Sequence, residues 1–265
     1  MQDLKILALQ SDLYWENPEK NLLEFENQIA VSFDSHQLIV LPETFTTGFP
    51  VDPHKFAEEI SGSTVSWMRQ ISAKYNTVIT GSLLIKTGDS YANTLIWMLP
   101  DGKYESYKKR HVFSMGGEHE KITAGTDKLI VNLHGWKIRL MICYDLRFPV
   151  WSKNLHGKDD GFEYDLAIYV ANWPAVRSYP WKTLLLARAI ENQAFVIGLN
   201  RVGTDGPGNS YSGDSMIVDP KGNVLAQGNE FKSDALSVEL SYNEITEFRN
   251  KFNVGNDWDE FVIKA

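Results

Sequence analysis

The sequence is poor in cysteine: Cys143 is the only one in 265 residues. A single thiol excludes an intramolecular disulfide, a Cys-x-x-Cys redox pair and a zinc site made of several thiolates. Such scarcity is typical of proteins in a reducing compartment. Two interpretations of Cys143 remain, because a lone cysteine either packs as a small apolar side chain, as most do, or reacts.

Long apolar runs are absent as well. No stretch approaches the roughly 20 apolar residues that a membrane-spanning helix needs. Residues 1–5 lack the basic and then apolar layout of a secretory signal peptide. We therefore expect a soluble, cytoplasmic protein with no membrane partner.

Positive charge is in deficit, with 26 lysines and arginines against 34 aspartates and glutamates and a net charge of −8. This balance argues against nucleic acid as a partner, although a local pair of cations would still hold a small anion. The six histidines are scattered without metal-ligand spacing, so we expect neither a metal nor another cofactor. Residues 203–208 faintly resemble a dinucleotide-binding loop, but they contain a proline and precede a strand, which favours a surface loop.

The sequence is rich in apolar residues, at 43% with eight tryptophans, which is enough to fill a sizeable core. Apolar periodicity and turn signals predict that strands and helices alternate along the chain. Strands are expected at 4–10, 37–42, 77–85, 92–99, 138–142, 165–171, 195–202, 215–219, 223–226 and 236–240, and helices from Asn17 onward and at 63–75, 181–193 and 242–252. Turns are expected at 86–89 and 100–103. This alternation, without linkers or repeats, indicates an α/β layer fold in one domain, residues 1–265.

Three reactive residue types follow apolar runs. Cys143 closes the run 138–142, Glu43 closes the run 38–42, and Lys108 and Lys109 stand at a third change from apolar to polar residues. In α/β folds ligands bind at the carboxyl edge of a sheet, where such strand ends meet. Each residue alone has an ordinary explanation, since a Pro-Glu pair is usually a solvated turn and paired lysines are usually surface charge. Together they offer a base, a cation and a nucleophile to one pocket.

These segments carry a family resemblance. Leu41-Pro42-Glu43, Tyr107-Lys108-Lys109-Arg110-His111 and Cys143-Tyr144-Asp145-Leu146-Arg147-Phe148-Pro149 resemble the three motifs of the nitrilase superfamily of carbon–nitrogen hydrolases. Their separations, 66 residues from Glu43 to Lys109 and 34 from Lys109 to Cys143, are also similar to the family's. Later blocks at 169–174, 187–193, 200–203 and 211–215 extend the resemblance, and 172–174 and 200–203 resemble the omega-amidase (2-oxoglutaramate amidase) branch.

The resemblance implies a four-layer α-β-β-α sandwich of two mixed sheets, and a homodimer that stacks eight layers. It also implies a thiol amidohydrolase that cleaves the terminal amide of small 2-oxo acid omega-amides through a Cys143 thioester. Cys143 would be the nucleophile and Glu43 the general base and acid. Lys109, rather than Lys108, would stabilise the tetrahedral intermediate, because it stands two residues before His111.

The family also has a second glutamate, for which this chain offers Glu118 and Glu120. We favour Glu118 because of its seven-residue distance to Gly125. An amide carbon is a poor electrophile, so a strong nucleophile beside a cation suits the reaction, and we expect Lys109 to favour the thiolate. The Lys109 ammonium and the Tyr144 N–H would then donate to the oxyanion.

Substrate recognition is predicted on the segment after the strand at 165–171. There Asn172 and Trp173 are expected to line the pocket, with Arg177 as a partner for a substrate carboxylate. Trp173 as a core aromatic and Arg177 as a surface charge at a helix start are the competing interpretations.

Other functions stay open at this point. The same three catalytic residue types cleave nitriles and N-carbamoyl groups in the family, and a catalytically silent binding scaffold is a further alternative. His111 or His119 would serve as the base if the site were built like that of papain, although both are more typical of structural or pocket-lining positions.

Overall fold

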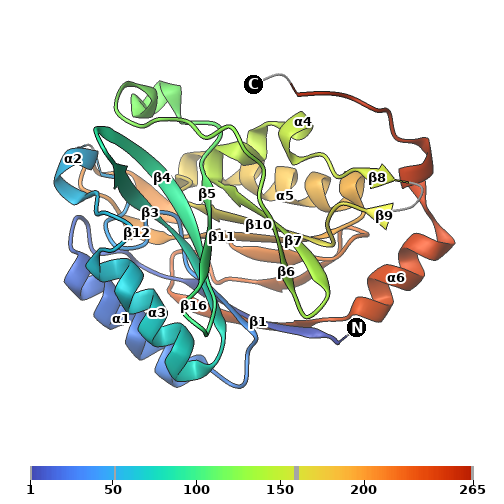
Figure 1. Ribbon diagram of the computed structural model, residues 1–265, viewed down its shortest axis with the longest axis horizontal. Coiled ribbons are helices and arrows are strands. Elements are labelled where there is room, and N and C mark those ends of the chain that lie inside the picture. The colour runs from blue at the N-terminus through green and yellow to red at the C-terminus, as the bar shows by residue number, and fades with distance from the viewer. Residues whose placement is uncertain (1, 51, 158–160, 264–265) are drawn as a thin grey trace.

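The computed structural model describes residues 2–50, 52–157 and 161–263. Two six-stranded sheets pack face to face, with helices on their outer sides (Figure 1). The first sheet has the order β16-β1-β2-β3-β4-β5 and the second β15-β14-β11-β10-β7-β6. Both sheets mix parallel and antiparallel pairs, with β1, β2 and β3 parallel in one and β7, β10 and β11 parallel in the other.

The strands of the first sheet are β1 (Leu4–Gln10), β2 (Leu38–Val40), β3 (Val78–Thr87), β4 (Ser90–Met98), β5 (Tyr104–Lys108) and β16 (Asp234–Leu240). Those of the second are β6 (Ile130–Leu133), β7 (Trp136–Ile142), β10 (Leu166–Ala171), β11 (Phe195–Asn200), β14 (Met216–Val218) and β15 (Val224–Gln227). Two short hairpins pair β8 (His156–Gly157) with β9 (Gly161–Phe162), and β12 (Val202–Thr204) with β13 (Ser210–Ser212).

The helices are α1 (Pro18–Ser32), α2 (Pro53–Phe56), α3 (Ser63–Tyr75), α4 (Pro149–Ser152), α5 (Ser178–Asn192) and α6 (Tyr242–Lys251). Short 3₁₀ turns lie at η1 (Ser114–Gly116), η2 (Glu118–Glu120), η3 (Cys143–Arg147), η4 (Ala175–Arg177) and η5 (Val254–Asp257). None of the helices in the described ranges has both the length and the apolar character that crossing a bilayer requires.

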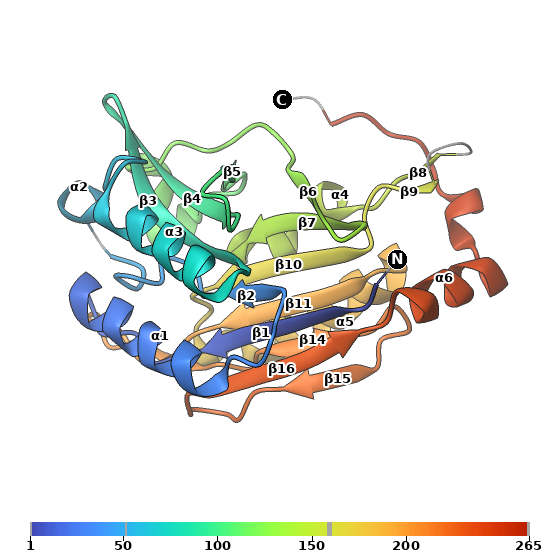
Figure 2. The ribbon, with the colours of Figure 1, turned by 60° about the horizontal axis from the view of Figure 1, so that its bottom comes forward.

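Strand alternation explains why the first sheet is buried on both faces. In β1, Leu4, Ile6 and Ala8 belong to the core between the two sheets, whereas Leu7 and Leu9 belong to the core beneath α1 and α3. Successive side chains of a strand point to opposite faces, so an unbroken apolar run serves both layers. Figure 2 shows α1 and α3 outside the first sheet and α5 behind the second. The predicted α-β-β-α sandwich is confirmed.

Most element boundaries agree with the sequence. Asn17 caps α1 by accepting from the Lys20 N–H at 3.1 Å, and Pro18 fills the first turn. Helix α5 begins at Ser178, three residues before the predicted start at 181. Pro180 lies in the first turn of α5, where a missing N–H removes no helical hydrogen bond.

Several segments differ from expectation, and the elements α2, β5, β8, β9 and β13 were not predicted. The predicted turn at 86–89 is shorter, since β3 continues to Thr87 and β4 begins at Ser90 around a two-residue loop with Gly88 at φ +59°. The predicted strand at 195–202 is divided into β11 and β12. Strand β6 was not predicted, because Ile130–Leu133 is only four residues long and is too short to show a clear period.

Candidate active site

Glu43 follows the carboxyl end of β2, and its side chain is fully buried. Its Oε1 accepts hydrogen bonds from Lys109 Nζ at 2.9 Å and from Asn93 Nδ2 at 2.8 Å. Its Oε2 accepts the backbone N–H of Asn172 at 2.7 Å. A carboxylate held by three donors has a fixed orientation, as a general base requires.

Lys109 follows β5 and is 1% exposed, whereas the adjacent Lys108 points outward. Its ammonium lies 2.9 Å from Glu43 Oε1 and 3.0 Å from Glu118 Oε2. Burial disfavours the charged form of Lys109, but the carboxylates of Glu118 and Glu43 outweigh burial and raise the pKa of this lysine above its ordinary value. Lys109 is therefore a permanent cation. Glu120, the alternative second glutamate, is exposed.

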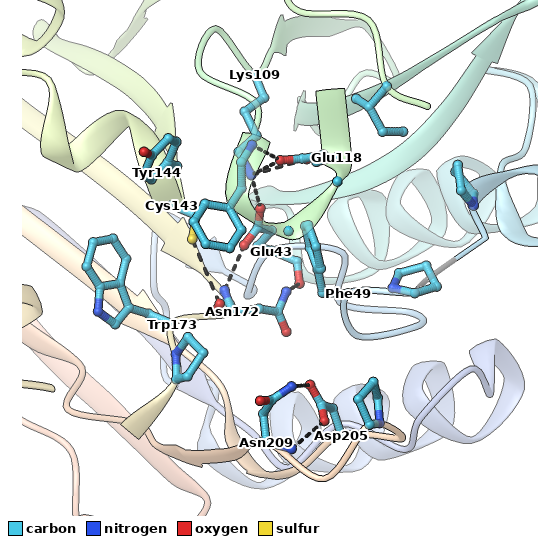
Figure 3. Close-up of a pocket in the computed structure, with 18 of the residues that line it drawn as sticks. Glu43, Phe49, Lys109, Glu118, Cys143, Tyr144, Asn172, Trp173, Asp205 and Asn209 are labelled. Carbon is cyan, nitrogen blue, oxygen red and sulfur yellow. Dashed lines mark hydrogen bonds and ion pairs between the residues drawn. The ribbon is translucent and has the colours of Figure 1, made fainter. Parts of the chain in front are cut away.

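Cys143 is the first residue of η3, directly after β7, and its φ of +44° lies in the left-handed region. This conformation costs an L-residue about 1–2 kcal/mol, so the surrounding turn must hold it in place. The side chain reaches the cavity, and the sulfur lies 3.9 Å from the Asn172 carbonyl oxygen. Figure 3 shows this sulfur close to Glu43 and to Lys109.

Three influences act on the protonation state of Cys143. Burial raises the pKa of the thiol, the Glu43 carboxylate raises it further, and the Lys109 ammonium lowers it. The resulting pKa lies well above the ordinary value, which favours the neutral thiol over the thiolate. The Lys109 ammonium favours the thiolate, as predicted. Burial and the Glu43 carboxylate oppose it, and together they have the larger effect on the pKa of Cys143.

Asn172 follows β10 in the second sheet and lines the same cavity as Glu43 of the first. Its Nδ2 donates to the Glu43 carbonyl oxygen at 2.7 Å and to Thr44 Oγ1 at 3.0 Å. Because Nδ2 is fixed in this way, Oδ1 is buried without a hydrogen-bond partner in the described part of the chain. The side chain thus joins the two sheets and leaves one acceptor free.

Trp173 and Arg177 both belong to the cavity wall. Trp173 is 3% exposed, and its indole N–H donates to the Arg177 carbonyl at 2.8 Å, so the ring is part of the core as well as of the wall. Arg177 ends η4 and is half-buried, with its guanidinium 5.6 Å from the centre of the Phe113 ring. Arg177 therefore stands at a helix start and also lines the pocket, so the two interpretations given above both apply.

A second cavity arginine, Arg147, was not singled out from the sequence. It ends η3 and lies over the Trp173 ring, with its guanidinium carbon 4.7 Å from the ring centre. Across the described ranges, neither Arg147 nor Arg177 has an acidic partner. An arginine stacked on an aromatic ring keeps the N–H groups at its edge available to a carboxylate.

The cavity has a volume of about 490 Å³. Tyr144, the residue after the thiol, forms part of its wall and packs edge-on against Phe113 and Phe148, each at 5.1 Å between ring centres. Apolar walls with a few converging polar groups are typical of small-molecule sites.

Two groups of site residues were missed by sequence reasoning. Asn93 lies within β4, and its strand was predicted, but only the register of β3 with β4 shows that this amide reaches Glu43. Of the predicted loop at 203–208, residues 203 and 204 belong to β12, and the rest lies in the connection of the hairpin to β13. However, Asp205, Pro207 and Asn209 reach the cavity, and Figure 3 shows Asp205 and Asn209 joined there. A Gly-rich loop carries no signal for such a position.

The histidine alternatives are not supported as bases by the geometry. The His111 Nδ1 lies 2.8 Å from Asp145 Oδ1, and its ring stacks on Phe148 at 3.7 Å. His119 is exposed. In residues 2–50, 52–157 and 161–263, no three histidine, cysteine, aspartate or glutamate side chains form a group that could hold a metal ion.

Comparisons with known proteins agree with this arrangement. A carbon–nitrogen hydrolase family profile matches residues 5–250. The chain is 42% identical to omega-amidase YafV of Escherichia coli (strain K12), over 99% of this chain and 100% of the relative. It is 32% identical to 2-oxoglutaramate amidase of Bacillus subtilis (strain 168), over 95% and 96%. The crystal structure of XC1258 from Xanthomonas campestris, a CN-hydrolase superfamily protein with an arsenic adduct in its active site, superposes with a TM-score of 0.97 at 38% identity, covering all of both chains.

Proposed function

Because the chain belongs to the carbon–nitrogen hydrolase family, we propose that its cavity hydrolyses an amide through a thioester on Cys143. The chain is an omega-amidase, which converts small 2-oxo acid omega-amides such as 2-oxoglutaramate and 2-oxosuccinamate to the 2-oxo acid and ammonia. The observation that supports the mechanism best is the contact of Glu43 and Glu118 with one buried ammonium, Lys109, beside the only thiol.

In the first half-reaction the amide carbon meets the Cys143 sulfur. The neutral thiol transfers its proton to Glu43 as the sulfur–carbon bond forms, which leaves the substrate oxygen negatively charged. The Lys109 ammonium and the Tyr144 N–H donate to this oxyanion, and removal of one such donor typically costs about 10²–10³ in rate. Glu118 holds Lys109 toward the oxyanion.

The tetrahedral intermediate then collapses. Glu43 returns the proton to the amide nitrogen, the carbon–nitrogen bond breaks and ammonia leaves, so that a thioester remains on Cys143. In the second half-reaction Glu43 takes a proton from water while the water oxygen attacks the thioester carbon. The proton passes from Glu43 to the departing sulfur, which restores the resting enzyme and releases the acid.

The rest of the cavity would hold the substrate. Asn172 and Trp173 line it next to the thiol. Arg177 and Arg147 would bind the carboxylate at the far end of the 2-oxo acid. Lys109 is less suited to this role because two carboxylates already compensate its charge.

The proposal extends to the domain organisation, the oligomeric state, the location and the cofactor requirement of the protein. Residues 1–265 would act as one domain, since the core between the two sheets contains side chains from both. Apolar side chains exposed on η4 and α5, namely Val176, Tyr179 and Ile190, support a homodimer through this face. The single cysteine supports a cytoplasmic location, and the self-sufficient set of Glu43, Lys109 and Cys143 supports a reaction without metal or cofactor.

The test is ammonia release from a small panel of substrates. We expect 2-oxoglutaramate and 2-oxosuccinamate to be hydrolysed much faster than glutamine, whose 2-amino group adds a positive charge near the two arginines. Equal rates on glutamine and 2-oxoglutaramate, or a preference for a simple nitrile or an N-carbamoyl amino acid, would reject this substrate assignment. Absence of turnover on the whole panel would favour a binding scaffold instead.

A further inference from the structure

One buried carboxylate beside the site takes no part in the reaction described above. Asp145 lies in η3, two residues after Cys143, and is fully buried. Its two oxygens accept four hydrogen bonds, and the donors come from the two chain segments that carry Lys109 and Cys143.

On the first sheet, Asp145 holds the residues on both sides of Lys109. Tyr107 donates its hydroxyl to Oδ2 at 2.7 Å, while His111 donates its backbone N–H at 3.0 Å and its Nδ1–H at 2.8 Å to Oδ1. Burial and the charge of Asp145 raise the pKa of the Tyr107 phenol well above its ordinary value, so this hydroxyl stays a donor. The backbone that presents Lys109 is therefore fixed at two points.

On the second sheet, Asp145 holds the start of the turn that presents the thiol. The backbone N–H of Ile142 donates to Oδ2 at 3.0 Å. Ile142 directly precedes Cys143, whose left-handed φ needs a well-held neighbour. One carboxylate thus contacts the nucleophile turn and the cation turn together.

This bridge matters because the two turns belong to different sheets. Lys109 follows β5 of the first sheet and Cys143 follows β7 of the second, and no ladder of backbone hydrogen bonds joins the sheets among the described residues. Apolar packing holds two layers together but constrains sliding between them less tightly than a saturated hydrogen-bond network does. The distance between the Lys109 ammonium and the Cys143 sulfur depends on such polar links.

We propose that Asp145 is a positioning residue, which sets the placement of Lys109 relative to Cys143 by tying the two sheets together at their active edge. This inference rests on the proposed roles of Lys109 and Cys143. A misplacement of about 1 Å between reacting groups costs on the order of 10² in rate, so loss of the bridge should act on the chemical steps. Substrate binding should change less than the chemical steps, because Arg177 lies outside η3, although Arg147 ends that turn.

The test is Asp145→Asn, which keeps the shape but replaces one acceptor oxygen by an N–H₂ group facing donors. Per folded enzyme, we expect kcat for 2-oxoglutaramate to fall on the order of 10–100-fold, while KM changes less than kcat does. Alkylation of Cys143 by iodoacetamide should also shift to higher pH, because a displaced Lys109 would lower the pKa of the thiol less. Unchanged kcat and an unchanged alkylation profile in the folded variant would show that Asp145 is merely structural, and would overturn the proposal.

Two further variants keep the test decisive. His111→Phe retains the stack on Phe148 and removes one donor to Asp145, so it should reduce kcat less than Asp145→Asn. If Asp145→Asn does not fold, the double variant Tyr107→Phe with His111→Phe takes its place, and normal kcat with a normal alkylation profile would again overturn the proposal. The alkylation measurement needs no substrate, so an error in the substrate assignment would leave its expected shift intact.

Discussion

Three of the cations that line the cavity, Lys109, Arg147 and Arg177, differ in how their charges are compensated. Lys109 is buried and held between Glu43 and Glu118 at 2.9 and 3.0 Å. Arg147 and Arg177 are half-buried, lie on aromatic rings, and have no acidic partner in the described ranges. The compensated cation suits a charge that develops only during the reaction, whereas the uncompensated pair suits a charge that the substrate already carries. Changes at the first should alter kcat, and changes at the second should alter KM.

The largest expected effect is at the thiol beside Lys109. Cys143→Ala should abolish hydrolysis, because no other described thiol is present to form the thioester. The circular dichroism spectrum should match that of the parent protein, which separates loss of chemistry from loss of fold. Retained activity in the folded variant would refute the proposed nucleophile.

Next comes Lys109 itself, with its neighbour as a matched control. Lys109→Met should lower kcat by about 10²–10³, the usual cost of losing an oxyanion donor. Lys108→Met should leave kcat unchanged, because Lys108 is exposed. The reverse pattern in steady-state kinetics would place the cation one residue earlier.

The arginines should respond differently. Arg177→Met and Arg147→Met should each raise KM for 2-oxoglutaramate by about 10–100-fold, since a hydrogen bond to a charged group contributes about 1.5–3 kcal/mol. A neutral amide of similar size serves as the control substrate, and its KM should stay nearly constant in both variants. Equal losses on the charged and the neutral substrate would remove the arginines from carboxylate recognition.

A smaller effect concerns the pH at which the thiol reacts. The Glu43 charge raises the pKa of Cys143 and the Lys109 charge lowers it. Alkylation by iodoacetamide should therefore move to lower pH in Glu43→Gln and to higher pH in Lys109→Met, although both variants lose turnover. Shifts in the same direction would contradict the proposed electrostatic roles.

The smallest expected effect is that of chelation. Glu43, Lys109 and Cys143 supply the base, the cation and the nucleophile, so hydrolysis should survive prolonged treatment with a chelator. Activity that disappears and returns only on addition of zinc would contradict this prediction.

Local sequence patterns predicted much of the fold and the main residues of the site. Strand ends followed by Glu43, Lys109 and Cys143 predicted which side chains would meet, although the structure places these strands in two facing sheets rather than at the edge of one. The cap at Asn17 predicted the start of α1, and the apolar run at 4–10 predicted β1. Both signals depend only on nearby residues.

Relations between segments distant in sequence could not be predicted in this way. The contact of Asn93 with Glu43 depends on strand register, and the approach of Asp205 to the cavity depends on how a hairpin folds back. The raised pKa of Cys143 depends on burial depth, which no local pattern shows. The roles of the site residues rest on geometry and family resemblance and stay predictions until the variants are measured.

The division of the site between two sheets has a consequence for biosynthesis. Glu43 receives its Asn172 contacts from a residue 129 positions later in the chain, at the end of a strand, β10, that pairs with β7 of the second sheet. A nascent or partly folded chain therefore carries its thiol without the base in place, and contacts of such long sequence separation form late and slowly. We expect amide hydrolysis to begin only when the two sheets have docked. Chains that are still being synthesised should therefore not hydrolyse substrate.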